Sequence, residues 1–218
     1  MKSGLRGFVF DLDGTLIDSK MDLVNSVNGM LRETGRAELP ADLVSSYVGH
    51  GAPQLIASAL GPQASEDQRA EALAIFMKQY RQRKLQETRA YAGVLEGLRG
   101  LARYPLAVLS NKPAKLSREI LEGLALTRYF RSVYGGDSFE NQKPHPSGAL
   151  AILKELELRP EEAAMVGDSD VDVETARNTG MLSVAVNYGF GKHDRERWPA
   201  DVYVDSLTEL LELSLDHR

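Results

Sequence analysis

Acidic and hydroxyl side chains follow several apolar segments of this sequence, each at the point where the segment ends. Asp11 and Asp13 follow the first segment, Ser110 follows a second, and Asp168 follows a later one. Several carboxylates in a small volume repel one another unless a cation lies among them, and their oxygens are preferred ligands of hard divalent ions. Magnesium fits best, because it keeps several waters and uses few carboxylates alongside a phosphate oxygen. We therefore expect Asp11, Asp13 and Asp168 to hold Mg²⁺.

The remaining polar groups are those that a phosphoryl group requires. The hydroxyl of Ser110, the ammonium of Lys143 and backbone N–H groups at the start of a helix can neutralise phosphoryl oxygens. Gly14 follows the second aspartate, which lets the backbone turn tightly and approach a ligand closely. Lys112 is interpreted as a residue that only flanks this set. The residues expected to bind the phosphoryl group or the substrate's other atoms near it are Gly14, Thr15, Ser110, Asn111 and Lys143.

Several residues also have an interpretation without chemistry. An aspartate at the start of a helix commonly caps its N-terminus, and we interpret Asp170 in this way rather than as a metal ligand. Asp172 is either a solvated helix residue or part of the surroundings of the site. His50 lies in a Gly-His-Gly turn, so it is either a substrate-binding residue or an exposed turn residue. The histidines expected on the surface are His145, His193 and His217.

For these side chains to meet, the apolar segments must be parallel strands of one sheet. The segments contain β-branched residues, are too short for helices and show little polar alternation, which is typical of buried strands. The expected strands cover residues 5–10, 106–109, 132–134, 163–166, 182–186 and 202–204. The expected helices between and after them cover residues 115–124, 147–156, 171–179 and 207–215. This alternation predicts an α/β fold with a doubly wound, mainly parallel, Rossmann-like sheet, whose ligands bind beyond the carboxyl ends of the strands.

Residues 18–88 follow a different pattern. Their apolar residues recur at helical spacing, as in the set Leu73, Phe76, Met77 and Tyr80, and glycines and prolines divide them without a convincing strand. We therefore predict an inserted all-helical cap domain at residues 18–88 and a catalytic core formed by residues 1–17 and 89–218. The linkers are expected near residues 16–18 and 87–93, and the apolar set is interpreted as the core of the cap or a seam between two caps.

The composition narrows the class of protein. The 218 residues are 43% hydrophobic and 26% charged, which is typical of a globular protein with a sizeable core. The lack of cysteine excludes disulfides and thiolate zinc sites, and a net charge of −5 provides no basic surface for a nucleic acid. The first apolar stretch is too short for a signal peptide or a membrane span. We expect a cytoplasmic monomer or homodimer that acts on a small phosphorylated metabolite.

The motifs resemble those of the haloacid dehalogenase-like phosphatase superfamily. The matching segments are Asp11-Leu12-Asp13-Gly14-Thr15 after an apolar strand, Ser110 after the next, Lys143, and Gly167-Asp168-Ser169-Asp170-Val171-Asp172. They occur in the family's order over nearly the whole chain, and the helical insert stands where that family has a helical cap. Residues 47–51, 110–113, 143–146 and 167–169 look most like phosphoglycolate phosphatases, although those often have threonine where Ser110 stands.

The resemblance implies a mechanism. Asp11 would be the nucleophile that forms an aspartyl phosphate, while Asp13 would protonate the leaving alcohol and then activate water. The Asp11 carboxylate, the Asp13 main-chain carbonyl and Asp168 would hold Mg²⁺, and Lys143 would stabilise the transferred group. Asp172 would lie behind them and orient the metal ligands or the lysine. The implied reaction is hydrolysis of a phosphomonoester, with 2-phosphoglycolate as the first candidate.

Other functions remain open from the sequence. Family dehalogenases attack carbon and lack the second aspartate, so Asp13 favours phosphoryl transfer over dehalogenation. Another capped phosphatase, acting on pyrophosphate, nucleotides or sugar phosphates, and a phosphomutase share the same first step. A signalling receiver whose aspartate is phosphorylated as a switch is the main alternative outside enzymes. The length, the helical insert and the position of Asp13 argue against the receiver, and a binding protein with a vestigial site is the least attractive alternative.

Overall fold

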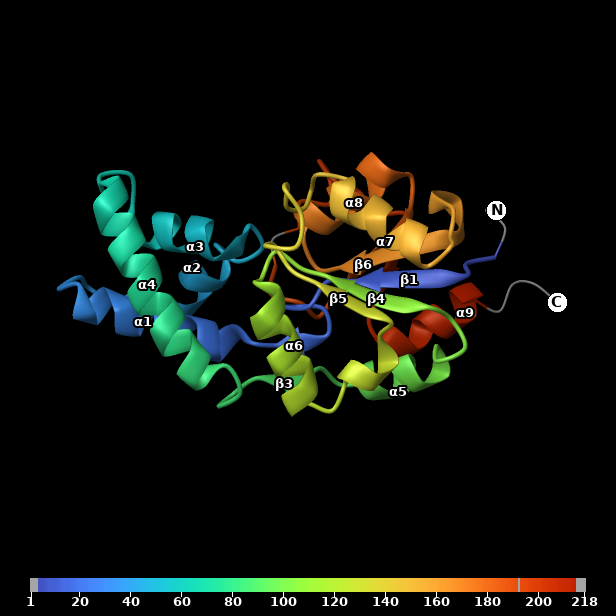
Figure 1. Ribbon diagram of the computed structural model, residues 1–218, viewed down its shortest axis with the longest axis horizontal. Coiled ribbons are helices and arrows are strands. Elements are labelled where there is room, and N and C mark those ends of the chain that lie inside the picture. Colours follow the sequence, from blue (N-terminus) through green and yellow to red (C-terminus); the bar gives the residue numbers. More distant parts are fainter. Residues whose placement is uncertain (1–3, 192, 215–218) are drawn as a thin grey trace.

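The computed structural model describes residues 4–191 and 193–214, and a six-stranded sheet lies at its centre (Figure 1). The strand order is β5-β4-β1-β6-β7-β8, and all neighbouring strands are parallel. In chain order the strands are β1 (Gly7–Phe10), β4 (Leu106–Leu109), β5 (Ser132–Tyr134), β6 (Ala163–Gly167), β7 (Leu182–Val186) and β8 (Val202–Val204). The predicted parallel α/β sheet is confirmed, and every apolar segment expected to be a strand contributes one to it.

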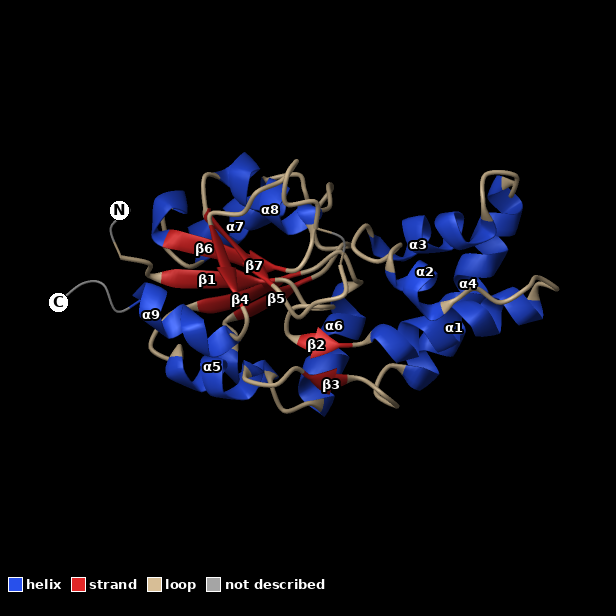
Figure 2. Cartoon of the chain, turned by 180° about the vertical axis from the view of Figure 1, so that it is seen from behind, coloured by secondary structure: helices blue, strands red, loops and turns tan. Residues whose placement is uncertain are grey.

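Successive side chains of each strand face opposite sides of the sheet, and helices cover both sides (Figure 2). Phe8 and Phe10 belong to one apolar core, whereas Val9 and Met165 belong to another. The helices packed on the Phe8 side are α5 (Val94–Gly100), α6 (Ala114–Gly123) and α9 (Leu210–Ser214), and those on the Val9 side are α7 (Ser147–Glu155) and α8 (Asp170–Thr179). Because both faces are buried, the strands consist almost entirely of apolar residues, as the sequence pattern indicated.

Four helices between the first strand and the rest of the sheet form a lobe at one end of the molecule (Figure 1), which we call the helical insert. They are α1 (Lys20–Glu33), α2 (Ala41–Ser45), α3 (Gly51–Leu60) and α4 (Glu66–Arg83). Helix α1 packs against α2 and α4, and α3 packs against α4. The capping box of Ser65 and Gln68 begins α4, because each side chain bonds the other residue's backbone N–H. The assignment of residues 18–88 to a separate domain stays a prediction.

The two connections of the helical insert contain short strands that the sequence pattern did not predict. β2 (Ile17–Asp18) and β3 (Arg89–Ala90) pair antiparallel where the chain enters and leaves the insert (Figure 2). Two residues are too few to show an alternating pattern, so these segments were expected to be plain linkers. The pairing ties the two connections together at the base of the insert.

The predicted helices were otherwise nearly right. The last one, expected at residues 207–215, is divided into a 3₁₀ turn at Leu207–Glu209 followed by α9, and residue 215 lies outside the described residues. Helix α5 was not predicted at all. Within the part of the chain that the structure describes, no helix has both the length and the hydrophobicity needed to cross a membrane.

Candidate active site

Three neighbouring strands at the middle of the sheet end at the same edge, and each is followed by a buried polar residue. β1 lies between β4 and β6, and these strands lead to Asp11, Ser110 and Asp168 respectively. The backbone N–H of Asp11 still donates to the carbonyl oxygen of Val166 at 2.9 Å, so the first residue beyond β1 is held by the sheet. The fold therefore brings the three residues together with little conformational freedom.

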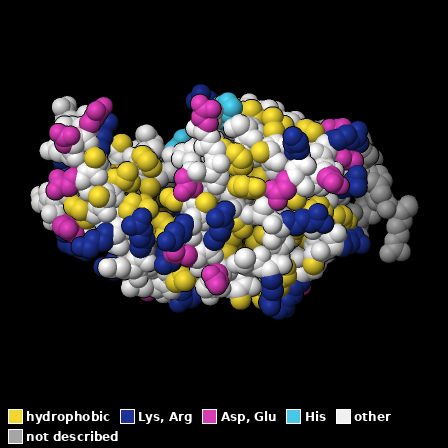
Figure 3. All heavy atoms as spheres, in the orientation of Figure 1, with side chains coloured by type: hydrophobic (Ala, Val, Ile, Leu, Met, Phe, Trp, Pro, Cys, Tyr) yellow, Lys and Arg dark blue, Asp and Glu magenta, His cyan; other side chains and the backbone are white. Residues whose placement is uncertain are grey.

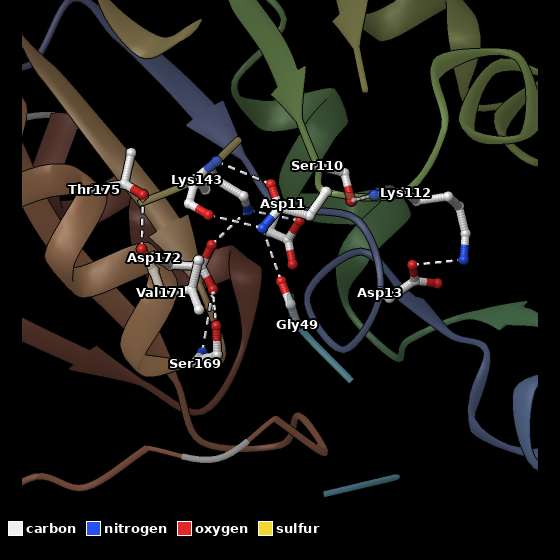
Figure 4. Close-up of polar contacts among 11 residues, drawn as sticks. Asp11, Asp13, Gly49, Ser110, Lys112, Lys143, Ser169, Val171, Asp172 and Thr175 are labelled. Atoms are coloured by element: carbon white, nitrogen blue, oxygen red, sulfur yellow. Dashed lines mark hydrogen bonds and ion pairs between the residues drawn. The ribbon is translucent and has the colours of Figure 1, made fainter. Parts of the chain in front are cut away.

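Asp11, Asp168 and Asp172 form an acidic cluster, in which one carboxylate oxygen from each residue lies within 4.8 Å of the others. The Lys143 ammonium is 2.8 Å from Asp11 Oδ1 and 2.6 Å from Asp172 Oδ1, so it bridges these two carboxylates (Figure 4). Three buried carboxylates share this one ammonium in the cluster. The remaining negative charge and the oxygen ligands fit a hard divalent cation.

Burial makes the carboxyl groups of this cluster hard to ionise. It raises the pKa of Asp11 to about 6, with a further increase from nearby Asp172, although the Lys143 ammonium acts in the opposite direction. Burial also raises the pKa of Asp168 well above its usual value, and the charges of Asp172 and Asp11 add to the increase. Burial lowers the pKa of Lys143, but attraction by Asp11 and Asp172 outweighs it, so the ammonium stays charged.

Glycines surround the Asp168 carboxylate. The backbone N–H of Gly191 donates to Asp168 Oδ2 at 2.6 Å. Gly14 has a φ of 86°, and a side chain there would collide with the same carboxylate oxygen. A side chain at Gly189 would collide with Asp168 as well. The loop at residues 187–191 therefore lies against Asp168 at the rim of this crevice, and the close approach needs glycine.

Asp13 does not belong to the acidic cluster, because its side chain pairs with other residues. Lys112 Nζ lies 2.6 Å from Asp13 Oδ2, and the hydroxyl of Ser19 donates to Asp13 Oδ1 (Figure 4 shows the lysine pair). Lys112 Nζ also donates to the hydroxyl oxygen of Tyr80, on α4, at 2.8 Å. The two aspartates of the first motif therefore lie in different ion pairs, Asp11 with Lys143 and Asp13 with Lys112.

Lys112 and Tyr80 are functional candidates that the sequence did not indicate. Burial lowers the pKa of Lys112, but attraction by Asp13 and Tyr80 raises it above the usual value for lysine. Burial raises the pKa of Tyr80 to about 12, so its phenol is neutral near pH 7. Tyr80, Lys112 and Asp13 are far apart in the sequence, and only the packing of the helical insert against the strand ends brings them together.

A cavity lies between the helical insert and the strand ends. The core contributes polar residues to it, including Asp11, Asp13, Ser110 and Asp168. The insert contributes mainly apolar side chains, which are Leu23, Val48, Ala52, Leu55, Phe76 and Met77, together with Tyr80. Figure 3 shows the notch between the two parts, with hydrophobic side chains gathered beside it on the insert. A ligand held by the aspartates would therefore meet an apolar wall on its other side.

The comparison with known families decides the class of this protein. The family model described as haloacid dehalogenase-like hydrolase matches residues 8–186. The chain belongs to the haloacid dehalogenase-like hydrolase family. The resemblance seen in the motifs is thereby confirmed, and the match includes the helical insert as well as the sheet from Phe8 in β1 to the end of β7.

Several phosphatases are similar to this haloacid dehalogenase-like hydrolase over most of its length. It is 37% identical over 212 residues to Phosphoglycolate phosphatase 1 of Pseudomonas aeruginosa, covering 93% of this chain and 77% of that protein. It is 36% identical over 220 residues to the phosphoglycolate phosphatase of Chromobacterium violaceum, covering 96% of each. A crystal structure described as a predicted phosphoglycolate phosphatase from Haemophilus somnus matches with a TM-score of 0.90 and 29% identity over 96% of this chain and 97% of that one. The chain is therefore a phosphatase of this hydrolase family, similar to phosphoglycolate phosphatases.

The structure gives some predicted site residues of this hydrolase different surroundings from those expected. The Asn111 side chain makes two hydrogen bonds with the backbone of Lys143, both at 2.9 Å, and donates to the carbonyl oxygen of Gly49 at 2.9 Å. Asn111 thus fixes the backbone that carries Lys143, in addition to lining the cavity. Ser110 lines the cavity too, and its hydroxyl accepts from the backbone N–H of Lys112 at 3.3 Å.

The residues that line the cavity of the hydrolase do not include four of those expected to bind substrate, which are Gly14, Thr15, His50 and Lys143. The Thr15 hydroxyl is buried and has no hydrogen-bond partner among the described residues, while the Thr15 carbonyl accepts from Tyr188 at 2.9 Å. His50 is the exposed residue just before α3, and its neighbours Gly49 and Gly51 line the cavity instead. Sequence reasoning located the right turn but could not tell which of its residues faces inward.

The start of α8 corrects the interpretation of Asp170. Ser169 is the N-cap residue, and Asp172 completes the capping box because it accepts from both the backbone N–H and the hydroxyl of Ser169, at 3.2 and 2.7 Å. Asp170 is instead the first helical residue and accepts from the backbone N–H of Asp194 at 2.8 Å. Ser169 rather than Asp170 is the N-cap residue, because the Ser169 hydroxyl can donate to Asp172 while Asp172 is held by Lys143.

His145 and His193 do not line the cavity. His145 is exposed, as expected, with its ring 3.0 Å from the hydroxyl of Ser147. His193 was expected on the surface but is half-buried, because its ring stacks on Tyr203 and its Nε2 lies 2.7 Å from the carbonyl oxygen of Trp198. His217 lies outside the described residues.

Proposed function

We propose that this phosphatase hydrolyses 2-phosphoglycolate to glycolate and inorganic phosphate through an aspartyl phosphate on Asp11, with Mg²⁺ as cofactor. The proposal rests on one observation, which is that Asp11 and Asp13 belong to one motif but have different neighbours. Asp11 lies beside Lys143 in the acidic cluster, whereas Asp13 lies beside Lys112 in the cavity. Two carboxyl groups in one site but with different partners are what a nucleophile and a separate acid and base require.

The reaction has two steps. In the first, a carboxylate oxygen of Asp11 attacks phosphorus, the bond between phosphorus and the ester oxygen breaks, and Asp13 gives its proton to the leaving alcohol. In the second, Asp13 takes a proton from a water that attacks the phosphorus of the aspartyl phosphate, which releases inorganic phosphate and restores Asp11. Lys143, whose Nζ lies 2.8 Å from Asp11 Oδ1, would supply a positive charge beside the attacking carboxylate.

The donor set fits the proposed cofactor. Asp11 and Asp168 offer carboxylate oxygens from strand ends, and the main-chain carbonyl of Asp13 is the third proposed ligand. Mg²⁺, when bound there, supplies positive charge to the oxygens of the transferred phosphoryl group. Asp172 would act through Lys143, which it holds at 2.6 Å.

The identity of the substrate rests on the named relatives and on the shape of the cavity. The relatives from Pseudomonas aeruginosa and Chromobacterium violaceum carry the name phosphoglycolate phosphatase and match over most of this chain. The apolar side chains of the helical insert leave room near the strand ends for a small leaving group and offer few polar partners to a sugar or a nucleoside. Both observations favour a small phosphate ester.

The test is phosphate release from a panel of esters with Mg²⁺ present. We expect 2-phosphoglycolate to have the highest kcat/KM in a panel that includes pyrophosphate, a nucleoside monophosphate and a sugar phosphate. Excess chelator should abolish turnover, and Mg²⁺ should restore it.

Asp11→Asn should lower kcat by at least about 1,000-fold, because it removes the nucleophile while keeping the shape of the side chain. If 2-phosphoglycolate is among the poor substrates, the substrate assignment is wrong; full activity of D11N would contradict the mechanism.

A further inference from the structure

A buried ammonium faces the side of the cavity where the leaving group would lie. Lys112 is 8% exposed and lies between the core and the helical insert, with its Nζ 2.6 Å from Asp13 Oδ2, 2.8 Å from the hydroxyl of Tyr80 and 4.6 Å from the centre of the Tyr80 ring. Nothing in the mechanism above uses this charge. Its distance from Asp13, the residue that protonates the leaving oxygen, places it next to whatever is attached to that oxygen.

Lys112 shares its carboxylate partner with another donor. Asp13 Oδ2 lies 2.6 Å from the Lys112 ammonium, while Asp13 Oδ1 accepts from the hydroxyl of Ser19. A buried ammonium is stabilised by each anion placed beside it. A substrate carboxylate next to Lys112 would therefore be bound favourably.

No other cation among the described residues that line the cavity could take this role. Lys112 is the one lysine or arginine side chain in that lining, and Lys143 is already held between Asp11 and Asp172 in the acidic cluster. The neighbouring walls are apolar, with Leu116 on the core side and Met77 on the insert. An anionic group on the substrate would therefore be directed to Lys112.

We propose that Lys112 and the hydroxyl of Tyr80 bind a carboxylate of the leaving group and so select phosphate esters whose alcohol carries an acidic group. This inference rests on the proposed function and deepens it, since in 2-phosphoglycolate the carboxylate is attached to the carbon that bears the ester oxygen. It also assigns a specificity-determining residue to each side of the cavity, one from the core and one from the helical insert.

The hydrogen-bonding capacity of the pair matches a carboxylate. A lysine ammonium has three donors, and the two oxygen contacts described for Lys112 leave one of them for a ligand. The Tyr80 oxygen accepts from Lys112, so its own hydrogen is available to donate. The Tyr80 ring is stacked on Phe76 at 5.6 Å between ring centres with an angle of 5° between planes, which fixes the position of the hydroxyl.

The experiment compares two substrates on each variant. We would measure kcat/KM for 2-phosphoglycolate and for 2-hydroxyethyl phosphate, in which a neutral hydroxymethyl group replaces the carboxylate, and take their ratio. Lys112→Met should lower both values, because Asp13 loses its partner, but the ratio should fall about 10- to 100-fold further, as expected for loss of a charged hydrogen bond. Because both substrates are measured on the same preparation, the ratio does not depend on the fraction of protein that folds.

Three further variants complete the test. Lys115→Met removes the same charge from an exposed position on α6 and should leave the ratio unchanged. Lys112→Arg keeps a charge and should restore part of the preference, while Tyr80→Phe should lower the ratio by about 10-fold or more, in line with a hydrogen bond to a charged ligand group.

The outcomes separate this inference from the proposed function. Suppose that the wild type prefers 2-phosphoglycolate and that K112M lowers kcat/KM by the same factor for both substrates. Lys112 then acts only as the partner of Asp13, so the inference is wrong while the proposed function stands. If the wild type hydrolyses the neutral ester and not 2-phosphoglycolate, the proposed substrate is wrong and the carboxylate site falls with it.

Discussion

At the residue scale, the acidic cluster links protonation to stability. The pKa of Asp11 is raised from 3.8 to about 6 and that of Asp168 also lies well above its usual value. Between pH 3.8 and about pH 6, the Asp11 carboxyl keeps its proton in the folded protein, whereas the same group has lost its proton in the unfolded chain. Without metal, the contribution of Asp11 to the free energy of unfolding therefore decreases as the pH rises from about 4 to about 6.

We predict that Mg²⁺ stabilises the protein more near pH 7.5 than near pH 5, because the ion binds the ionised carboxylates and competes with their protons. At a Mg²⁺ concentration about 100 times its dissociation constant, the stabilisation at the higher pH should be about 3 kcal/mol, a rise of several degrees in the melting temperature. Scanning calorimetry at the two pH values, with Mg²⁺ and with chelator, measures it.

Asp168→Asn should abolish most of the Mg²⁺-dependent shift, whereas Asp67→Asn, at an exposed position in the first turn of α4, should keep it. An equal shift at both pH values would show that the ion does not bind these carboxylates.

At the scale of elements, a single carboxylate joins the two chain segments that lead into and out of the helical insert. Asp22, in the first turn of α1, is 1% exposed. It accepts hydrogen bonds from the backbone N–H groups of Glu87 and Thr88 and, at 2.7 Å, from the hydroxyl of Thr88. The sequence before β3 is thereby fixed to the start of α1, next to the β2–β3 ribbon.

Asp22→Ala should lower the free energy of unfolding by about 3 kcal/mol, because it leaves the buried backbone N–H and hydroxyl of Thr88 without their partner. It should also lower kcat/KM, since the insert that carries Tyr80 would no longer be held at a fixed angle to the strand ends. Urea denaturation and steady-state kinetics measure the two effects. Glu71→Ala, at an exposed position of α4, is the control and should change stability by less than about 0.5 kcal/mol. Wild-type stability in D22A would show that the Asp22 contacts contribute little.

The parts of the molecule that the sequence could predict are those with a local pattern. β1 and β6 are apolar runs buried along their whole length, and each ends just before a residue that enters the site, so the position of Asp11 and Asp168 followed from the pattern alone. Helix α5 lacked such a signal, because it contains Gly97 and Gly100, which lower helix propensity. In the fold Gly97 is needed, since a side chain there would collide with the backbone of Leu207.

The pairing of Lys112 with Tyr80 could not be predicted, because it depends on how α4 of the insert lies against the loop after β4. No spacing within the sequence encodes a contact between residues that belong to two different parts of the chain. For the same reason the apolar set that contains Phe76, Met77 and Tyr80 was read as core or dimer seam, although all three also line the cavity.

At the scale of the whole molecule, the cavity makes the helical insert and the sheet share one ligand. Its lining includes Phe76, Met77 and Tyr80 from α4, Phe190 and Gly191 from the loop after β7, and the aspartates at the strand ends. A ligand that contacts both sides stabilises the arrangement in which they face each other, because any opening of the cavity would first have to release it. The proposed division into a core and a cap at residues 18–88 therefore has a measurable consequence.

We predict that Mg²⁺ with inorganic phosphate slows backbone hydrogen exchange in residues 76–83 of α4 and in residues 187–191, by up to about 100-fold when the ligands are at 100 times their dissociation constants. Helix α7 lies on the Val9 side of the sheet and contributes no residue to the cavity lining, so its exchange should change least and provides an internal control. Exchange measured by mass spectrometry on peptides from these three segments makes the comparison. Slower exchange at residues 11–15 and 168–170 without any change in α4 would mean that phosphate binds to the sheet edge alone, and that the helical insert does not close on the product.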